Sequence, residues 1–255
     1  MTLLALTRPV PEGLARCQLT HIERTPIDLA RARAQHAGYE DALAALGCEI
    51  RRISGADHLP DCVFIEDTAV VLDEIAVLAR PGAISRVEEV DAVSAALSPV
   101  RDLRWVGAPG TLDGGDVLRL GRQLYVGVGG RSSREGADQL LAAVRPFGYE
   151  VRTVGTRECL HLKSAATELA PDVVLVNPGW IDPATFAGVA AIEVDPSEPF
   201  AANVLRIGDT VLCAEAYPRT RERIEAAGIR TRTVDVSELA KAEGALTCCS
   251  LIVNT

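Results

Sequence analysis

One unit recurs along this chain and limits the folds that are open to it. Two short apolar strands joined by a tight turn are followed by a helix and then by one more strand. The clearest case pairs residues 63–72 with 75–79, opens a helix at the capping box Ser85–Glu88 and returns at 103–106. Hairpins of the same kind are expected at 116–128, 165–177 and 203–214, each with its own helix and return strand.

The two ends of the chain supply the remaining unit. A helix is predicted near Pro26–Leu46, with Pro26 at its first turn, and a strand follows at 48–53. The last strand, Ser250–Val253, has no mate downstream, and Leu3–Leu6 is its natural partner. That pairing closes a ring of five units, so we predict one α/β domain over residues 1–255, a five-bladed pseudo-symmetric ββαβ propeller.

Composition narrows the classes of function. No apolar run approaches the roughly 18 residues that a membrane span needs. A net charge of −9 argues against a nucleic-acid partner and suits a small cationic substrate. Seven cysteines without disulfide spacing, and a start without a basic signal region, favour reduced thiols and the cytoplasm. The sequence leaves a homodimer open.

Polar residues gather where the chain enters each hairpin. The five junctions hold, in order, Asp61 to Asp67, Asp113 to Asp116, His161, Asn203 and Cys248. Equivalent positions in a ring of repeats face the same point, so these side chains should converge at one mouth of the axis. A thiol, an imidazole and several carboxylates would then form a Cys/His/acid constellation from distant segments.

Each of these residues also has a purely structural interpretation. Free Cys is often a buried hydrophobe. Neighbours on a strand point to opposite faces, so either Glu66 or Asp67 would be a solvated surface acid. Asp113 and Asp116 flank two glycines and suit a turn. Cys159, His161 and the terminal cysteines lack the paired spacing of a structural zinc site, so no metal is expected.

Five segments together resemble the dimethylarginine dimethylaminohydrolases, within the guanidino-modifying enzyme superfamily. They occur in the family's order and span nearly the whole chain: Leu59-Pro-Asp-Cys-Val-Phe-Ile-Glu-Asp67, Arg80 to Arg86, Thr111 to Leu118, His161-Leu-Lys-Ser164 and Leu246-Thr-Cys-Cys-Ser250. The resemblance implies a five-bladed propeller with a central active site, in agreement with the repeats.

The resemblance also implies roles for individual residues. It gives catalytic roles to the nucleophile Cys248, the general acid/base His161 and its supporting acid Asp113, with Cys249 turned into packing. The implied substrate-binding residues are Glu66 and Asp67 for the guanidinium, Asp61, Arg86 and Arg131 for the amino-acid end, and Leu19 in a lid over the pocket.

The implied chemistry is hydrolysis of N-methylated arginines to citrulline and an amine through a covalent thiouronium on Cys248, without a cofactor. Zinc would inhibit by capturing Cys248 and His161. The nearest rivals act on arginine, agmatine or a ureido compound by the same chemistry, although the helical insertion of arginine deiminases is absent. Transfer of the amidino group to an amine is a further rival. A non-catalytic amino-acid-binding propeller is the alternative from another class.

Overall fold

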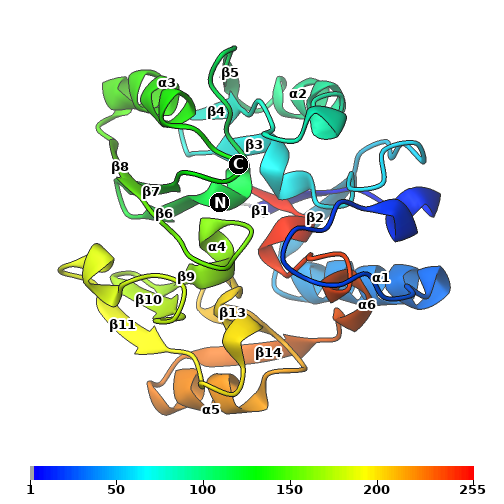
Figure 1. Ribbon diagram of the computed structural model, residues 1–255, viewed down its shortest axis with the longest axis vertical. Coiled ribbons are helices and arrows are strands. Elements are labelled where there is room, and N and C mark those ends of the chain that lie inside the picture. The colour runs from blue at the N-terminus through cyan, green and yellow to red at the C-terminus, as the bar shows by residue number, and fades with distance from the viewer. Residues whose placement is uncertain (1–2) are drawn as a thin grey trace.

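The computed structural model describes residues 3–255 and contains five three-stranded sheets set around a central axis (Figure 1). In each sheet an antiparallel pair is followed by a parallel third strand. One blade shows the pattern: β3 (Ala69–Val71) pairs with β4 (Ile75–Leu78), α2 (Glu89–Leu97) crosses over, and β5 (Asp102–Trp105) runs parallel to β4. The predicted ββαβ propeller is confirmed.

Three more blades repeat this order. Their elements are β6 (Val117–Leu120), β7 (Gln123–Gly127), α3 (Arg134–Val144) and β8 (Glu150–Val154); β9 (Ala166–Ala170), β10 (Val173–Val176), the 3-10 helix Pro183–Phe186 and β11 (Ala190–Glu193); and β12 (Leu205–Ile207), β13 (Thr210–Ala214), α5 (Pro218–Ala226) and β14 (Arg230–Val234). Helices α2, α3 and α5 lie on the outside of the ring (Figure 1).

The two ends of the chain close the ring. β15 (Leu251–Asn254) pairs antiparallel with β1 (Leu3–Thr7), with Leu4 opposite Val253, as predicted. After α1 (Leu29–Ala45), β2 (Cys48–Arg52) runs parallel to β1. The last strand therefore completes the sheet that contains β1 and β2. As a result, the segment before β15 lies near the axis.

Helix starts follow the side chains that cap them. α1 begins at Leu29 rather than at Pro26, because the Asp28 carboxylate accepts the N–H of Arg31. α3 begins after Ser133, whose hydroxyl accepts the N–H of Gly136. The predicted capping box does not form: the chain makes a 3-10 turn at Ile84–Arg86, and α2 starts at Glu89 without a side-chain cap.

The segment predicted as a strand over 63–72 is also different. Only Ala69–Val71 is extended, and Ile65–Thr68 forms a 3-10 helix. A strand would send Glu66 and Asp67 to opposite faces, whereas in this turn both side chains are buried. The prediction that one of the two acids lies on a solvated surface is therefore wrong.

The apolar core is divided among clusters between the sheets and their covering helices. In one of them, Tyr39 and Leu43 of α1 pack with Leu246 and Cys249 beside the last strand. This packing holds the loop that leads into β15. Among residues 3–255, no helix combines the length and apolar character that a membrane crossing requires.

Candidate active site

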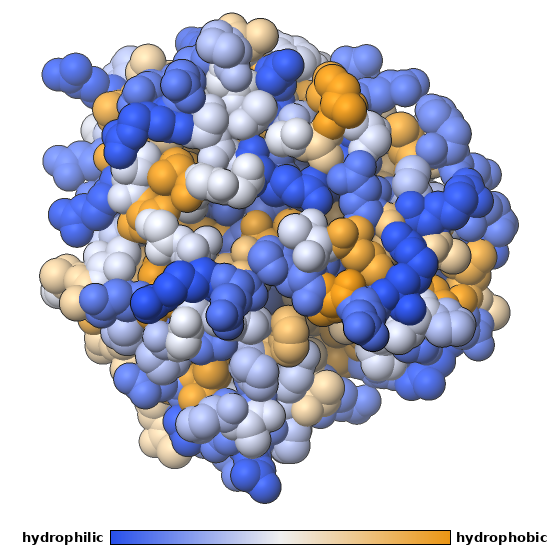
Figure 2. All heavy atoms as spheres, viewed as in Figure 1, coloured by the Kyte–Doolittle hydropathy of each residue, from blue (hydrophilic) through white to orange (hydrophobic). Residues whose placement is uncertain are grey.

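Cys248 and His161 line one small cavity near the axis of the ring. Asp67 and Phe64 form its wall from the second blade. The full lining is Gln18, Asp61, Phe64, Asp67, Arg86, Arg131, Leu160, His161, Ala242, Glu243 and Cys248. The face that Figure 2 presents is hollowed near its centre, where hydrophilic and hydrophobic residues meet. Loops that enter three different blades thus meet at this cavity, as the repeat predicted, whereas Asn203, which was expected to join them, lines a second pocket.

His161 is held by two carboxylates. Its Nε2 lies 3.1 Å from Oδ2 of Asp113, and its Nδ1 lies 3.7 Å from Oδ1 of Asp67. The other oxygen of Asp113 accepts the N–H of Gly82 at 2.8 Å, so the carboxylate cannot rotate freely. Gly115 packs against the imidazole: a Cβ there would lie 2.7 Å from Nδ1 of His161. The ring is therefore oriented tightly in the cavity.

Cys248 sits in a 3-10 turn, Thr247–Cys249, immediately before β15. Its side chain is partly exposed to the cavity, whereas Cys249 is fully buried in the core, as expected. The hydroxyls of Tyr39 and Ser250 lie 2.7 Å apart and tie the turn to α1. A rigid base thus presents one of two adjacent thiols to the cavity.

Burial and charge set the protonation of the pair. Burial opposes charge on His161. The negative charge of Asp67, a hydrogen bond with Asp113 and the negative charge of Asp116 outweigh it and raise the pKa of the imidazole to about 9. Burial, together with the charges of Glu66 and Asp67, raises the pKa of the Cys248 thiol to about 12. At neutral pH the free site therefore holds an imidazolium beside a neutral thiol.

The two adjacent acids lie in different places. Asp67 lines the cavity, where Arg86 binds one of its oxygens. Burial would raise the pKa of Asp67, but His161 and Arg86 lower it below its usual value. Glu66 is outside the cavity: its carboxylate accepts hydrogen bonds from Lys163 and the Thr247 hydroxyl at 2.6 Å each. The structure thus places Asp67 in the cavity lining and Glu66 outside it, although the charge of Glu66 still acts on the Cys248 thiol.

The groups expected at the amino-acid end are partly engaged. Arg86 is buried and donates to Glu89 and to the carbonyl oxygen of Phe64 at 2.8 Å each. Arg131 is freer, with one 3.3 Å contact to the hydroxyl of Thr20. Asp61 is buried, which raises its pKa, and accepts the N–H of Gln18. Of the two cations in the cavity lining, Arg131 is therefore the less engaged.

The segment expected to form a lid contributes Gln18 to the lining at this end. Leu19 packs on the apolar core beside the cavity rather than lining it, and Gln18 lines it instead. The carboxylate of Glu243 accepts the backbone N–H groups of Thr20 and His21 at 2.6 Å each. Sequence reasoning missed Gln18 and Glu243, since neither lies in a motif and their pairing depends on tertiary contact.

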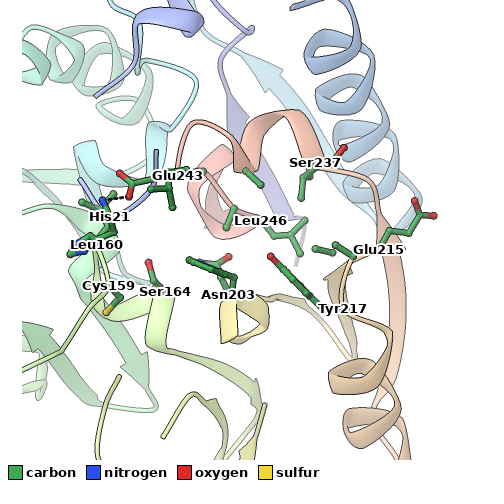
Figure 3. A pocket seen from close by; sticks show the side chains of 18 of the residues that line it. His21, Cys159, Leu160, Ser164, Asn203, Glu215, Tyr217, Ser237, Glu243 and Leu246 are labelled. Atoms are coloured by element: carbon green, nitrogen blue, oxygen red, sulfur yellow. Dashed lines mark hydrogen bonds between the residues drawn. The ribbon is translucent and has the colours of Figure 1, made fainter. Parts of the chain in front are cut away.

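A second pocket, drawn in Figure 3, shares Leu160 and Glu243 with the lining of the first. Asn203, Tyr217 and Leu246 contribute side chains to it, and His21 joins Glu243 at its edge (Figure 3). Its walls come from the loops that precede both His161 and Cys248. No Lys or Arg lines it among the described residues.

Asp67, Asp113 and His161 are the one group among residues 3–255 whose ligand atoms could converge on a metal ion. Arg86 already binds one oxygen of Asp67, and the raised pKa of His161 keeps its imidazole protonated at neutral pH, which leaves no ring nitrogen free for a metal ion. Cys248 is outside the group. The donor set does not fit a resident metal centre.

Comparison with known proteins places these features in context. No family model matches the chain. A dimethylarginine dimethylaminohydrolase of Streptomyces coelicolor is 40% identical over 249 residues, covering 97% of this chain and 95% of the relative. The Pseudomonas aeruginosa enzyme of the same name is 33% identical over 227 residues, covering 88% and 89% of the two chains.

Solved structures agree. A cysteine-to-serine mutant of the Pseudomonas aeruginosa enzyme complexed with citrulline superimposes with a TM-score of 0.94 at 29% identity, covering 99% of this chain and 100% of the other. A histidine-to-glycine mutant of a dimethylarginine dimethylaminohydrolase, in an adduct with S-methyl-L-thiocitrulline, gives 0.94 at 30% identity with the same coverage.

Proposed function

Because the chain belongs to the dimethylarginine dimethylaminohydrolase family, we propose that it hydrolyses asymmetric dimethylarginine and monomethylarginine to citrulline, releasing dimethylamine or methylamine. One observation carries this assignment: Cys248, the His161–Asp113 pair and Asp67 meet at a single cavity. Residues 1–255 would act as one catalytic domain. The seven free thiols favour the cytoplasm.

Binding begins with charge. A guanidinium is planar and presents N–H groups that a carboxylate accepts in pairs, so Asp67 would hold the cation beside the Cys248 sulfur. Arg131 would bind the carboxylate of the amino acid. Orientation of carbon and sulfur supplies much of the rate, because the guanidinium carbon is a poor electrophile.

The first half-reaction forms a carbon–sulfur bond and breaks a carbon–nitrogen bond. The bound cation lowers the cost of ionising Cys248, whose proton leaves to solvent, and the thiolate adds to the guanidinium carbon. The tetrahedral adduct collapses as the His161 imidazolium gives its proton to the departing amine. A thiouronium on Cys248 remains beside a neutral imidazole, which Asp113 keeps in place.

The second half-reaction returns the enzyme to its starting state. Neutral His161 takes a proton from a water that attacks the same carbon. As the carbon–sulfur bond breaks, the remaining hydroxyl proton passes to the departing thiolate, which yields citrulline and restores the neutral thiol. The proton that His161 gave to the amine is replaced by the one that it took from water. Glu66 takes part in no step of this scheme. Paired with Lys163, it would support the turn that holds Cys248.

Product release tests the proposal. Purified protein is given asymmetric dimethylarginine, monomethylarginine or arginine with EDTA present, and citrulline and amines are measured. The expected result is citrulline with an equal amount of methylated amine, lost in Cys248→Ala and retained in Cys159→Ala, which alters a thiol outside the catalytic cavity. Release from arginine alone would replace the assignment with a deiminase, and no release from any substrate would overturn it.

A further inference from the structure

The buried carboxylate of Asp116 helps to hold both His161 and Asp113 in place through hydrogen bonds to groups next to their backbones. Oδ1 of Asp116 accepts the backbone N–H of Leu162, the residue after His161, at 3.0 Å. Oδ2 of Asp116 accepts the hydroxyl of Ser132 at 2.7 Å. The same hydroxyl oxygen accepts the backbone N–H of Asp113 at 3.0 Å. The chain of contacts thus runs from His161 to Asp113 without passing through their side chains.

We infer that Asp116 is a positioning residue that sets the separation of the His161 imidazole and the Asp113 carboxylate, with Ser132 as its link to Asp113. This inference rests on the proposed function for its effect on turnover, but the geometry that it describes is independent of the substrate. Asp116 touches neither the cavity nor the reacting atoms, since it is absent from the cavity lining.

The surroundings of Asp116 explain why an acid is needed there. Leu162 opens the single-turn helix α4 (Leu162–Ala165), and His161 is its N-cap in extended conformation. Because the His161 side chain does not cap the turn, Asp116 satisfies the free N–H of Leu162 instead. A carboxylate has two oxygens, so the same group can also hold Ser132. Alanine would leave both donors without these acceptors.

Space around Asp116 is equally restricted. A Cβ on Gly127 would lie 2.8 Å from Oδ1 of Asp116. Gly127 ends β7, and the same Cβ would lie 3.1 Å from Cβ of Leu162, so β7 packs closely against both the carboxylate and Leu162. Asp116 also carries charge near the imidazole and contributes to the raised pKa of His161. Its removal should therefore change both the orientation of the ring and its titration.

The test compares Asp116→Asn, Asp116→Ala and Ser132→Ala. NMR titration follows the four histidine rings, with His161 assigned from the His161→Gln spectrum. Asp116→Asn keeps the shape but removes the charge and one of the two acceptor oxygens, so the His161 midpoint should move down by about one pH unit. Asp116→Ala should lower kcat about tenfold or more with little change in KM, because the lost support misaligns the acid–base pair rather than the binding groups. Ser132→Ala should give a smaller loss in kcat and leave the His161 midpoint near that of the unmodified protein.

Glu198→Ala provides the matched control. Glu198 is a buried acid that likewise accepts two backbone N–H groups, those of Arg219 and Thr220 in α5, and it does not line the cavity. Its loss should lower the melting temperature while leaving the His161 midpoint and the ratio of kcat to KM unchanged.

An unchanged His161 midpoint in Asp116→Asn would overturn the inference. So would equal effects of Asp116→Ala and Glu198→Ala on kcat. If the unmodified protein released no citrulline, the proposed function would fall, and the NMR midpoints would still decide the role of Asp116.

Discussion

The backbone N–H of Gln18 donates a hydrogen bond to the carboxylate of Asp61 at 3.1 Å. The resemblance places Asp61 at the amino-acid end of the substrate, so the expected lid segment contacts a residue that is itself expected to bind substrate. The carboxylate of Glu243 holds the same segment through Thr20 and His21. We therefore expect substrate entry to displace contacts that this segment makes with the rest of the chain.

Glu243→Ala should loosen this lid. Loss of the two backbone hydrogen bonds costs about 1 kcal/mol at an exposed site, which makes open forms about fivefold more populated. Iodoacetamide should then alkylate Cys248 about fivefold faster, as measured by peptide mapping. Glu158→Ala is the control, because Glu158 is another acid with a left-handed backbone, at φ 52° against 56° for Glu243, and it does not contact the lid. Equal rates in the two variants would contradict a latch.

Gly115→Ala should disable the acid–base pair. The new methyl group would lie 2.6 Å from Oδ1 of Asp67 and 2.7 Å from Nδ1 of His161, so the imidazole must move. A displacement near 1 Å can cost about a hundredfold in rate. Steady-state kinetics should show a fall in kcat of this order. Gly155→Ala should be nearly silent, since nothing lies within 4 Å of its Cβ position; a comparable loss there would show that the effect is not local.

The fold was predictable from sequence because five copies of one pattern reinforce each other. The pairing of the first strand with the last, which places Leu4 opposite Val253, followed from counting strands, because the last strand had no other partner. The two acids Glu66 and Asp67 were harder, because a 3-10 turn has no apolar period that distinguishes it from the strand it precedes. Their separation depends on Arg86 and Lys163, which reach them from distant segments.

The contacts of the lid segment were not predictable either, because they too depend on residues that are distant in sequence. Glu243 is one acid among many, and only tertiary folding brings it to Thr20 and His21. Leu19 was placed over the pocket by resemblance, yet its side chain packs on the core and its neighbour Gln18 faces the cavity. Short irregular segments carry no periodicity, so the side that each residue faces is fixed by packing.

Alkylation of Cys248 in the free protein should increase with pH beyond pH 9 and show no plateau near neutrality. The pKa of the thiol is about 12, because burial and the charges of Glu66 and Asp67 oppose a thiolate. Glu66→Gln should shift the pH dependence of the alkylation rate to lower pH by removing one of these charges. Glu168→Gln removes an acid that is paired with Arg206 and serves as the control. A rate that levels off below pH 7 would show that the free thiol is already ionised.

Stability should also report the protonation of His161. The pKa of its imidazole is about 9 in the folded protein and 6.5 as the ordinary value, so folding favours the charged form. The resulting stabilisation, about 3 kcal/mol, is fully present below about pH 6.5 and is lost as pH rises through about 9. Urea unfolding in a Cys248→Ala background, which removes the thiol's own titration, should show this loss. His161→Gln should flatten the curve, and an unchanged slope would contradict the raised pKa.

The most direct test of the account is to trap the intermediate. Protein turning over asymmetric dimethylarginine is quenched with acid, digested and analysed by mass spectrometry. We predict an adduct on the Cys248 peptide with the mass of the substrate less dimethylamine. His161→Ala should accumulate more adduct than the unmodified protein when it is supplied with a substrate whose leaving group needs no proton, such as S-methyl-L-thiocitrulline. Citrulline production with no adduct on Cys248 under any of these conditions, or an adduct on another cysteine, would contradict nucleophilic attack by Cys248.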